Sequence, residues 1–259
     1  MSQDIRISLM QYDIAWEDKE TNLNFIEKTV KKLSGSSDIV VLPEMCTTGF
    51  SMNSHNLAEE NSGKTISLIK SWAKNYNIAI CGSFIAKENN EFYNRGFFIT
   101  PQREYFYDKR HLFRMGSEPQ HFSSGDNRLV FKYKGFNICL LICYDLRFPV
   151  WARNVNNEYD LLIYAANWPT SRIKVWDALL TARAIENMSY VCGVNRIGKD
   201  GNGLEHCGKS KLINARGEEI SSLGANQELV ETVQLSKAEL ELFRNKFPVW
   251  KDADRFEIK

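Results

Sequence analysis

Cys143 is the residue of this sequence best placed for nucleophilic chemistry. The apolar run 136–142 predicts a buried strand, and Pro149 opens a helix-like segment soon after it. A thiol at such a strand-to-helix turn lies at the carboxyl end of a sheet, where ligands of α/β proteins usually bind. Cysteine is also a common space-filling residue, and that is how we interpret Cys139 in the same strand. The position makes Cys143 a candidate nucleophile.

Two further apolar runs end in an ionisable residue. The run 38–44 ends in Glu44, and the short run 105–109 ends in Lys109. Each has a structural alternative, because Glu44 could cap a helix or lie at a solvated edge, and Lys109 stands among charged neighbours that usually form a solvated face. If the strand ends meet, a carboxylate, an ammonium and a thiol share one pocket.

Alternating strands and helices must position these residues. The periodicity predicts strands at 6–10, 38–44, 78–85, 95–100, 105–109, 129–133, 136–143, 159–168, 190–195, 210–214 and 228–233. It predicts helices at 23–33, 62–75, 148–156 and 175–188, and a short one from 237. Asn89-Asn90 and Lys134-Gly135 are hairpin turn signals, and 198–208 is predicted to be a plain glycine-rich loop that borders the pocket. Because no linker or repeat divides the chain, we expect one domain over 1–259.

Composition and charge exclude several classes of protein. The 33 basic and 32 acidic residues give a net charge of +1, which provides no electrostatic case for nucleic acid or a membrane surface. No apolar run approaches the roughly 20 residues that span a bilayer, and residues 1–20 lack the apolar core of a signal peptide. The six cysteines include no C-x-x-C and no metal-ligand spacing. We expect a cytoplasmic protein with free thiols and no metal.

Three sequence motifs carry a resemblance to a known family. They are Leu42-Pro-Glu-Met45, Lys109-Arg-His-Leu-Phe113 and Cys143-Tyr-Asp-Leu-Arg-Phe148. In this order and at these separations they resemble the motifs of the nitrilase superfamily of carbon–nitrogen hydrolases, and the similarity extends from residue 6 to about 235. The stretches 109–116 and 167–169 are more specifically similar to its ω-amidase branch.

The resemblance implies an α/β fold, a four-layer α-β-β-α sandwich, and a catalytic triad of Glu44, Lys109 and Cys143. In that chemistry Glu44 is the general base, Cys143 attacks the amide carbonyl, and Lys109 with the N–H of Tyr144 stabilises the oxyanion. A thioester on Cys143 is then hydrolysed by water. A second glutamate of the family corresponds to Glu118, which would orient Lys109 or the substrate amide. No cofactor is implied.

For the substrate, the ω-amidase resemblance implies a small α-keto acid amide, 2-oxoglutaramate or 2-oxosuccinamate, that yields the keto acid and ammonia. Its carboxylate needs a cation, for which Arg114, Arg147 and Arg172 are the candidates. The other expected wall residues are Phe50, Tyr144, Asn167, Trp168 and Trp176.

Two alternatives stay open. The first is another substrate of the same family, namely deaminated glutathione, an N-carbamoyl compound or a nitrile. The second is a non-catalytic binding or scaffold protein, because fold does not fix function. The resemblance also implies a homodimer or higher homo-oligomer, with the segment from about 237 to 259 as one candidate interface.

Overall fold

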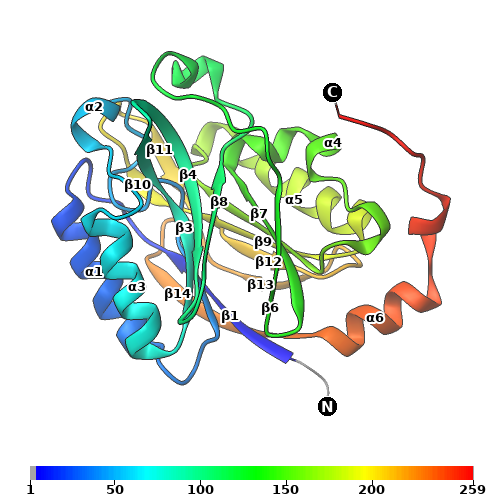
Figure 1. Cartoon of the computed structure of the whole chain (residues 1–259). Helices are drawn as coiled ribbons and strands as arrows, with labels where there is room; N and C mark the ends of the chain where they lie inside the picture. The colour runs from blue at the N-terminus through cyan, green and yellow to red at the C-terminus, as the bar shows by residue number, and fades with distance from the viewer. Residues whose placement is uncertain (1–3, 259) are drawn as a thin grey trace.

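The computed structural model describes residues 4–258 and contains two six-stranded sheets packed face to face (Figure 1). The first sheet consists, in spatial order, of β14 (Leu229–Ser236), β1 (Asp4–Gln11), β2 (Ile39–Val41), β3 (Ala79–Glu88), β4 (Glu91–Ile99) and β5 (Glu104–Asp108). The second consists of β13 (Glu219–Ser222), β12 (Lys211–Ile213), β9 (Tyr190–Asn195), β8 (Leu161–Ala166), β7 (Phe136–Ile142) and β6 (Leu129–Tyr133). A separate hairpin pairs β10 (Ile197–Lys199) with β11 (Glu205–Cys207).

Helices cover the outer faces of both sheets. The first sheet is covered by α1 (Lys19–Lys32) and α3 (Lys64–Tyr76), and the second by α4 (Pro149–Ala152) and α5 (Ile173–Asn187) (Figure 1). The remaining helices are α2 (Ser54–Leu57) and α6 (Lys237–Lys246). Short 3₁₀ helices are η1 (Arg114–Gly116), η2 (Glu118–Gln120), η3 (Cys143–Arg147), η4 (Val155–Asn157), η5 (Thr170–Arg172) and η6 (Val249–Asp252). The predicted α-β-β-α sandwich is confirmed.

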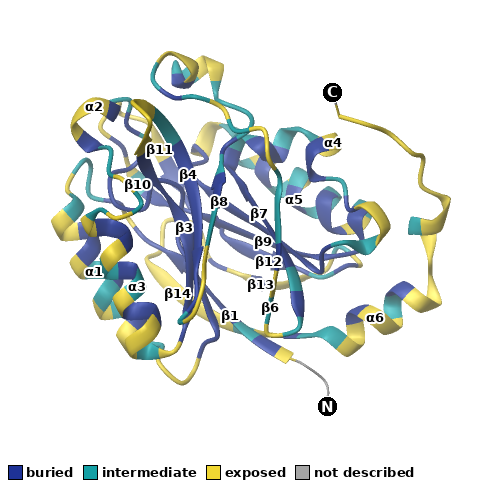
Figure 2. Ribbon diagram, viewed as in Figure 1, coloured by how far each residue is buried: buried dark blue, intermediate teal, exposed yellow. Residues whose placement is uncertain are grey.

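The core follows the two-residue alternation of the strands. In β1, Ile7 and Leu9 belong to the apolar cluster between the sheets, together with Ile138 and Leu140 of β7. Met10 points the other way and belongs to the cluster beneath α1 and α3. Figure 2 shows the result: the central strands of both sheets are buried, and the exposed residues lie on the outer sides of the helices, in β14, in loops and along the C-terminal segment. Burial on both faces explains why these strands read as continuous apolar runs.

The strand directions bring chemically useful residues to one edge. The pairs β1–β2 and β2–β3 are parallel in the first sheet, and β7–β8 and β8–β9 are parallel in the second. Because β5 is reached from β3 through two antiparallel pairings, it runs in the same direction as β3. Glu44 and Lys109 therefore leave the same edge of the first sheet, and Cys143 follows the carboxyl end of β7.

Both predicted two-residue hairpin turns are confirmed. Asn89 and Asn90 have φ values of 48° and 68°, and Lys134 and Gly135 have values of 44° and 86°. Positive φ at both central residues is the geometry whose twist matches the flanking strands. These turns fix the registers of β3 on β4 and of β6 on β7.

Two element predictions are wrong, and one strand was not predicted. The segment 198–208 is not a plain loop, because it contributes to the β10–β11 hairpin. The helix predicted over 148–156 ends at Ala152, and Asn156 adopts a left-handed φ of 53° that an α-helix cannot contain. The edge strand β13 was not predicted, because its sequence is short and mostly exposed.

The C-terminal segment after α6 extends along the outside of the molecule (Figure 1). Residues 251–258 are exposed, and the expected role of this segment in an oligomer stays a prediction. Residues 1–3 and Lys259, which belong to the predicted domain, lie outside the described residues. Within residues 4–258, every helix is too short or too polar to cross a bilayer.

Arg244 fastens α6 to the second sheet. Its guanidinium donates to Asp160 Oδ1 at 2.7 Å, to the Tyr159 carbonyl at 2.7 Å and to the Met188 carbonyl at 2.8 Å, and the residue is buried. Asp160 also pairs with Lys237, whose Nζ lies 2.5 Å from Oδ2, so removal of Arg244 would weaken the compensation of this buried charge and take a donor from two carbonyls. The contacts of Arg244 therefore couple α6 to the stability of the fold.

We expect Arg244→Ala to lower the free energy of unfolding by about 2–3 kcal/mol, because it removes a charged hydrogen-bond donor while Lys237 still pairs with Asp160; urea denaturation measures this. Lys246→Ala, on an exposed position of the same helix, is the control and should change it by no more than about 0.5 kcal/mol. Equal stabilities of the two variants would show that α6 does not depend on this contact.

Candidate active site

A buried ammonium between two carboxylates forms the floor of the site. Lys109 Nζ lies 2.7 Å from Glu44 Oε1 and 3.0 Å from each carboxylate oxygen of Glu118. Lys109 is 1% exposed, and both glutamates are 0% exposed. The loop that carries Glu118 also closes on itself, because the N–H of Phe113 donates to Glu118 Oε2 at 2.5 Å. Three of the four residues predicted to be catalytic thus form one hydrogen-bonded cluster.

Cys143 stands at a tight turn between β7 and η3. Its φ of 41° is left-handed, which is uncommon for a residue with a side chain and stores backbone strain. Asp145 holds the turn, since its Oδ2 accepts from the N–H of Ile142 at 3.0 Å and from the Tyr107 hydroxyl at 2.8 Å. Its Oδ1 accepts from the N–H of His111 at 3.0 Å. Asp145 therefore ties the cysteine turn to the strand and loop that carry the lysine.

Glu44 also reaches across to the second sheet. Its Oε2 accepts from the backbone N–H of Asn167 at 2.9 Å, and its own carbonyl accepts from Asn167 Nδ2 at 2.5 Å. Asn167 directly follows β8, the neighbour of β7. These two bonds align the strand ends of the two sheets, so that Glu44, Lys109 and Cys143 all line one cavity of about 590 Å³.

Five of the residues predicted to contact the substrate lie in the cavity wall. Phe50, Tyr144, Arg147, Asn167 and Trp168 line it. The Arg147 guanidinium lies over the Trp168 ring at 5.4 Å, which orients this cation at the wall. The pocket is therefore part aromatic and part cationic.

The other three predicted wall candidates have different outcomes. Arg172 lines the cavity, with its guanidinium 5.1 Å from the Phe113 ring. Arg114 is exposed and does not line the cavity. The expectation for Trp176 is wrong, because this side chain is 0% exposed, packs behind Trp168 and donates to the Lys209 carbonyl.

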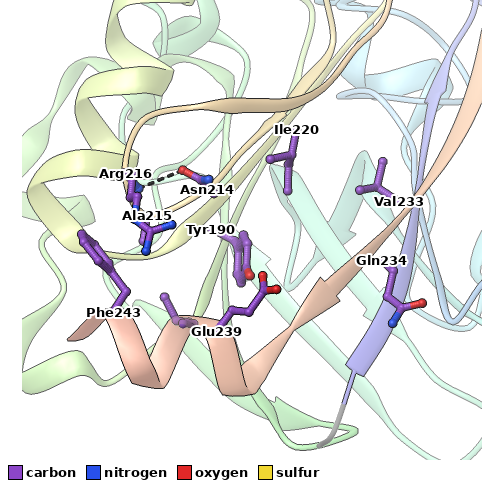
Figure 3. A pocket seen from close by; sticks show the side chains of 10 residues that line it. Tyr190, Asn214, Ala215, Arg216, Ile220, Val233, Gln234, Glu239 and Phe243 are labelled. Carbon is purple, nitrogen blue, oxygen red and sulfur yellow. Dashed lines mark hydrogen bonds between the residues drawn. The ribbon is translucent and has the colours of Figure 1, made fainter. Parts of the chain in front are cut away.

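A second, smaller pocket lies beside α6 and β14 and has a volume of about 170 Å³ (Figure 3). Arg216 lies over the Phe243 ring at 4.9 Å there, and its N–H donates to Asn214 Oδ1 at 2.9 Å. Its lining contains neither a cysteine nor a lysine. The thiol and ammonium needed for the predicted chemistry meet only in the larger of these two pockets.

The family model described as carbon–nitrogen hydrolase matches residues 6–245. The chain belongs to the carbon–nitrogen hydrolase family. The predicted nitrilase-superfamily resemblance and the predicted enzyme class, a hydrolase of carbon–nitrogen bonds in amides, are thereby confirmed.

Curated relatives align with this chain over nearly its full length. The chain is 42% identical to "Omega-amidase YafV" of Escherichia coli K12, with 98% of both chains covered. It is 32% identical to "2-oxoglutaramate amidase" of Bacillus subtilis, over 95% of this chain and 96% of that one. Among solved structures, XC1258 from Xanthomonas campestris, described as a CN-hydrolase superfamily protein with an arsenic adduct in the active site, superposes with a TM-score of 0.96. It is 39% identical to this chain, with 99% of both chains covered.

Burial dominates the electrostatics of this carbon–nitrogen hydrolase. It raises the pKa of the Cys143 thiol well above its usual value, and the charge of Glu44 raises it further, against the opposing charge of Lys109. Burial alone lowers the pKa of Lys109, but the charges of Glu118 and Glu44 outweigh it and raise that pKa above its usual value. The resting site therefore holds a neutral thiol beside a permanent ammonium, and the thiol needs a base to become a nucleophile.

Burial also raises the pKa of Glu118, and Glu44 adds to this effect, whereas the charge of Lys109 and donors from Asn94 and Phe113 oppose it. Within residues 4–258, no group of three or more His, Cys, Asp or Glu side chains is arranged to hold a metal ion.

Among the residues of the hydrolase site that sequence reasoning missed are Asn94 and His206. Asn94 in β4 is 0% exposed and donates to Glu44 and Glu118. Asparagine is depleted in strands, so its place between two apolar strand halves was the available signal. His206 in β11 is 3% exposed and lines the cavity, but it lay in the segment predicted to be a plain loop.

His206 is held neutral by its surroundings. Burial first, and then the charge of Arg196, lower the pKa of His206 to about 4. An unfolded histidine takes up its proton near about pH 6.5, so between these two values only the unfolded chain is protonated. Stability is unaffected above about pH 6.5 and falls as the pH drops from there toward 4.

We expect the free energy of unfolding to fall by about 2–3 kcal/mol more in the wild-type protein than in His206→Asn when the pH is lowered from 7 to 4.5. Urea denaturation at each pH measures this. Between pH 7 and 8 the two proteins should show the same pH dependence, which serves as the control. Parallel curves over the acidic range would contradict a buried neutral His206.

Proposed function

We propose that this hydrolase is an ω-amidase that removes the terminal amide of a small α-keto acid amide, such as 2-oxoglutaramate or 2-oxosuccinamate. One observation carries the proposal. The Glu44–Lys109–Cys143 group lies at the floor of a cavity whose wall presents two guanidinium groups, those of Arg147 and Arg172. In such a substrate the terminal amide would lie at the catalytic group, and the carboxylate at the other end would lie at the guanidinium groups.

In the first half of the reaction, Glu44 takes the proton of the Cys143 thiol, and the sulfur bonds to the amide carbon. The carbonyl electron pair moves onto oxygen. Lys109 Nζ can stabilise this oxyanion because its ammonium has three N–H groups. One donates to Glu44, a second is shared by the two oxygens of Glu118, and the third is left for the substrate. The backbone N–H of Tyr144, the next residue after the nucleophile, is the second proposed donor.

Collapse of this intermediate breaks the carbon–nitrogen bond. Glu44 returns its proton to the nitrogen, ammonia leaves, and a thioester remains on Cys143. In the second half, water gives a proton to Glu44 and attacks the thioester, the carbon–sulfur bond breaks, and the released thiolate regains that proton. Glu118 stays bonded to Lys109 and keeps the ammonium in place through both halves.

Recognition of the substrate has two further supports. Within residues 4–258, neither Arg147 nor Arg172 forms a salt bridge, so both charges are available to a carboxylate. Asn167 Oδ1 is buried at the cavity and has no hydrogen-bond partner among the described residues, which suits it to accept from the substrate amide N–H. The names of the E. coli and B. subtilis relatives point to the same substrate class. Cytoplasmic location and a homo-oligomeric state stay predictions.

Cys143→Ala should reduce ammonia release from 2-oxoglutaramate by roughly 10⁴-fold or more, because it removes the group that forms the covalent intermediate. Cys139→Ala, in the same strand and away from the cavity, is the matched control and should retain turnover. Intact-protein mass spectrometry during wild-type turnover should detect an acyl adduct at Cys143. Faster turnover of deaminated glutathione, an N-carbamoyl compound or a nitrile would replace the proposed substrate.

Arg147→Gln should raise KM for 2-oxoglutaramate by about 10- to 100-fold and change kcat much less, because the lost ion pair serves ground state and transition state alike. Steady-state kinetics with the acid and with its neutral ester separate charge recognition from a general defect, and only the acid should be affected. Arg114→Gln, at an exposed arginine outside the cavity, is the control. If only Arg172→Gln raises KM, the carboxylate binds at Arg172 instead.

A further inference from the structure

Asn94 lies between the two carboxylates of the site. Its Nδ2 donates to Glu44 Oε1 at 2.8 Å and to Glu118 Oε1 at 3.0 Å. The side chain belongs to β4, which lies between β3 and β5 in the first sheet, and it is 0% exposed. Both hydrogens of the amide group are therefore committed to the two glutamates.

A short relay fixes the orientation of this amide. The N–H of Met45 donates to Ser83 Oγ at 2.7 Å, so the Ser83 hydroxyl has its own hydrogen free to donate to Asn94 Oδ1, which lies at 2.9 Å. A rotated amide would place its carbonyl oxygen against two carboxylates. The donors of Asn94 consequently face Glu44 and Glu118 in every state in which both are ionised.

Charge makes this amide necessary. The buried cluster contains two carboxyl groups and one ammonium, Lys109, so full ionisation leaves an excess negative charge that Lys109 cannot compensate alone. Buried charge without hydrogen-bond donors is costly. Asn94 supplies two donors to this excess charge and adds no charge of its own.

The two oxygens of Glu44 are consequently unequal. Oε1 has two donors, Lys109 Nζ and Asn94 Nδ2, which occupy both of its lone pairs. Oε2 has a single donor, the N–H of Asn167, and this N–H also neighbours the sulfur of Cys143. Only Oε2 has a lone pair left, and its one donor, the Asn167 N–H, is also a neighbour of the thiol.

We propose that Asn94 is a positioning residue that keeps both glutamates ionised and directs the proton of Cys143 to Oε2 of Glu44. The inference rests on the proposed hydrolysis at Cys143 and assigns its proton path. The proton leaves sulfur for Oε2 as the carbon–sulfur bond forms, and it passes from Oε2 to the departing nitrogen as the carbon–nitrogen bond breaks. Glu118, whose oxygens have four donor contacts, takes no proton in this path.

The test is Asn94→Asp, which keeps the shape of the side chain and replaces its donor nitrogen by oxygen. The ionisable groups around position 94 are Glu44, Lys109, Glu118, Cys143 and, across the cavity, His206. Loss of donors to an ionised carboxylate makes its protonation easier. The pH below which kcat/KM falls, its acid limb, should therefore move up by roughly one pH unit or more. At pH 7, kcat should fall at least about tenfold with little change in KM.

The rate at which iodoacetamide alkylates Cys143 should be measured against pH as well. The acid limb of this profile, where the rate falls with falling pH, should move to higher pH in the same way. This readout needs no amide substrate, so it tests Asn94 even if 2-oxoglutaramate is not hydrolysed. Asn195→Asp is the matched control. Asn195 is equally buried, but its amide donates to the carbonyls of Trp168 and Gly208, so its variant should leave the limb in place.

An Asn94→Asp protein whose alkylation limb coincides with that of the wild type overturns the proposal and makes Asn94 a structural residue only. If this variant does not fold, as judged by its thermal transition, Ser83→Ala replaces it. That change leaves Asn94 in place but releases its amide, and it should move the limb in the same direction by a smaller amount. An unmoved limb in Ser83→Ala then overturns the proposal.

Discussion

The contact on which the rest of the site depends is the buried ammonium of Lys109 held between Glu44 and Glu118. Each of these groups is almost completely removed from water, and an isolated charge in that position would be strongly destabilising. Their mutual attraction offsets this cost only because the hydrogen bonds are short and further donors satisfy the remaining lone pairs. The surrounding strands must therefore hold these groups to within a fraction of an ångström.

The two-sheet architecture provides that rigidity. Glu44 and Lys109 follow strands of the first sheet, and Cys143 follows a strand of the second, so the thiol and its base approach from opposite sheets. Asn167 bonds to Glu44 across this boundary, and Asp145 bonds the cysteine turn to the segment that precedes and follows Lys109. The left-handed conformation of Cys143 can persist because these contacts surround it on both sides.

Much of this could be predicted from local patterns. Apolar runs marked the buried strands, and the turn residues Asn89-Asn90 and Lys134-Gly135 marked hairpins, because both signals depend on backbone preferences that act over a few residues. The helix predicted beyond Ala152 failed because Arg153 is extended, with a ψ of 127°, and Asn156 further on is left-handed. Asn94 and Ser83 escaped notice because a polar residue inside a strand has no meaning until its partners on other strands are known.

By itself, the sequence determined which residue types end the strands and, through the family motifs, which of them belong together. Strand periodicity depends on neighbouring residues and motif order on position along the chain, so both can be recognised in the sequence alone. Only the tertiary structure decided that Arg172 faces the cavity whereas Arg114 and Trp176 do not, and that one oxygen of Glu44 is saturated and the other is not. Such distinctions arise from contacts between segments far apart in the chain, whose directions depend on how the two sheets pack.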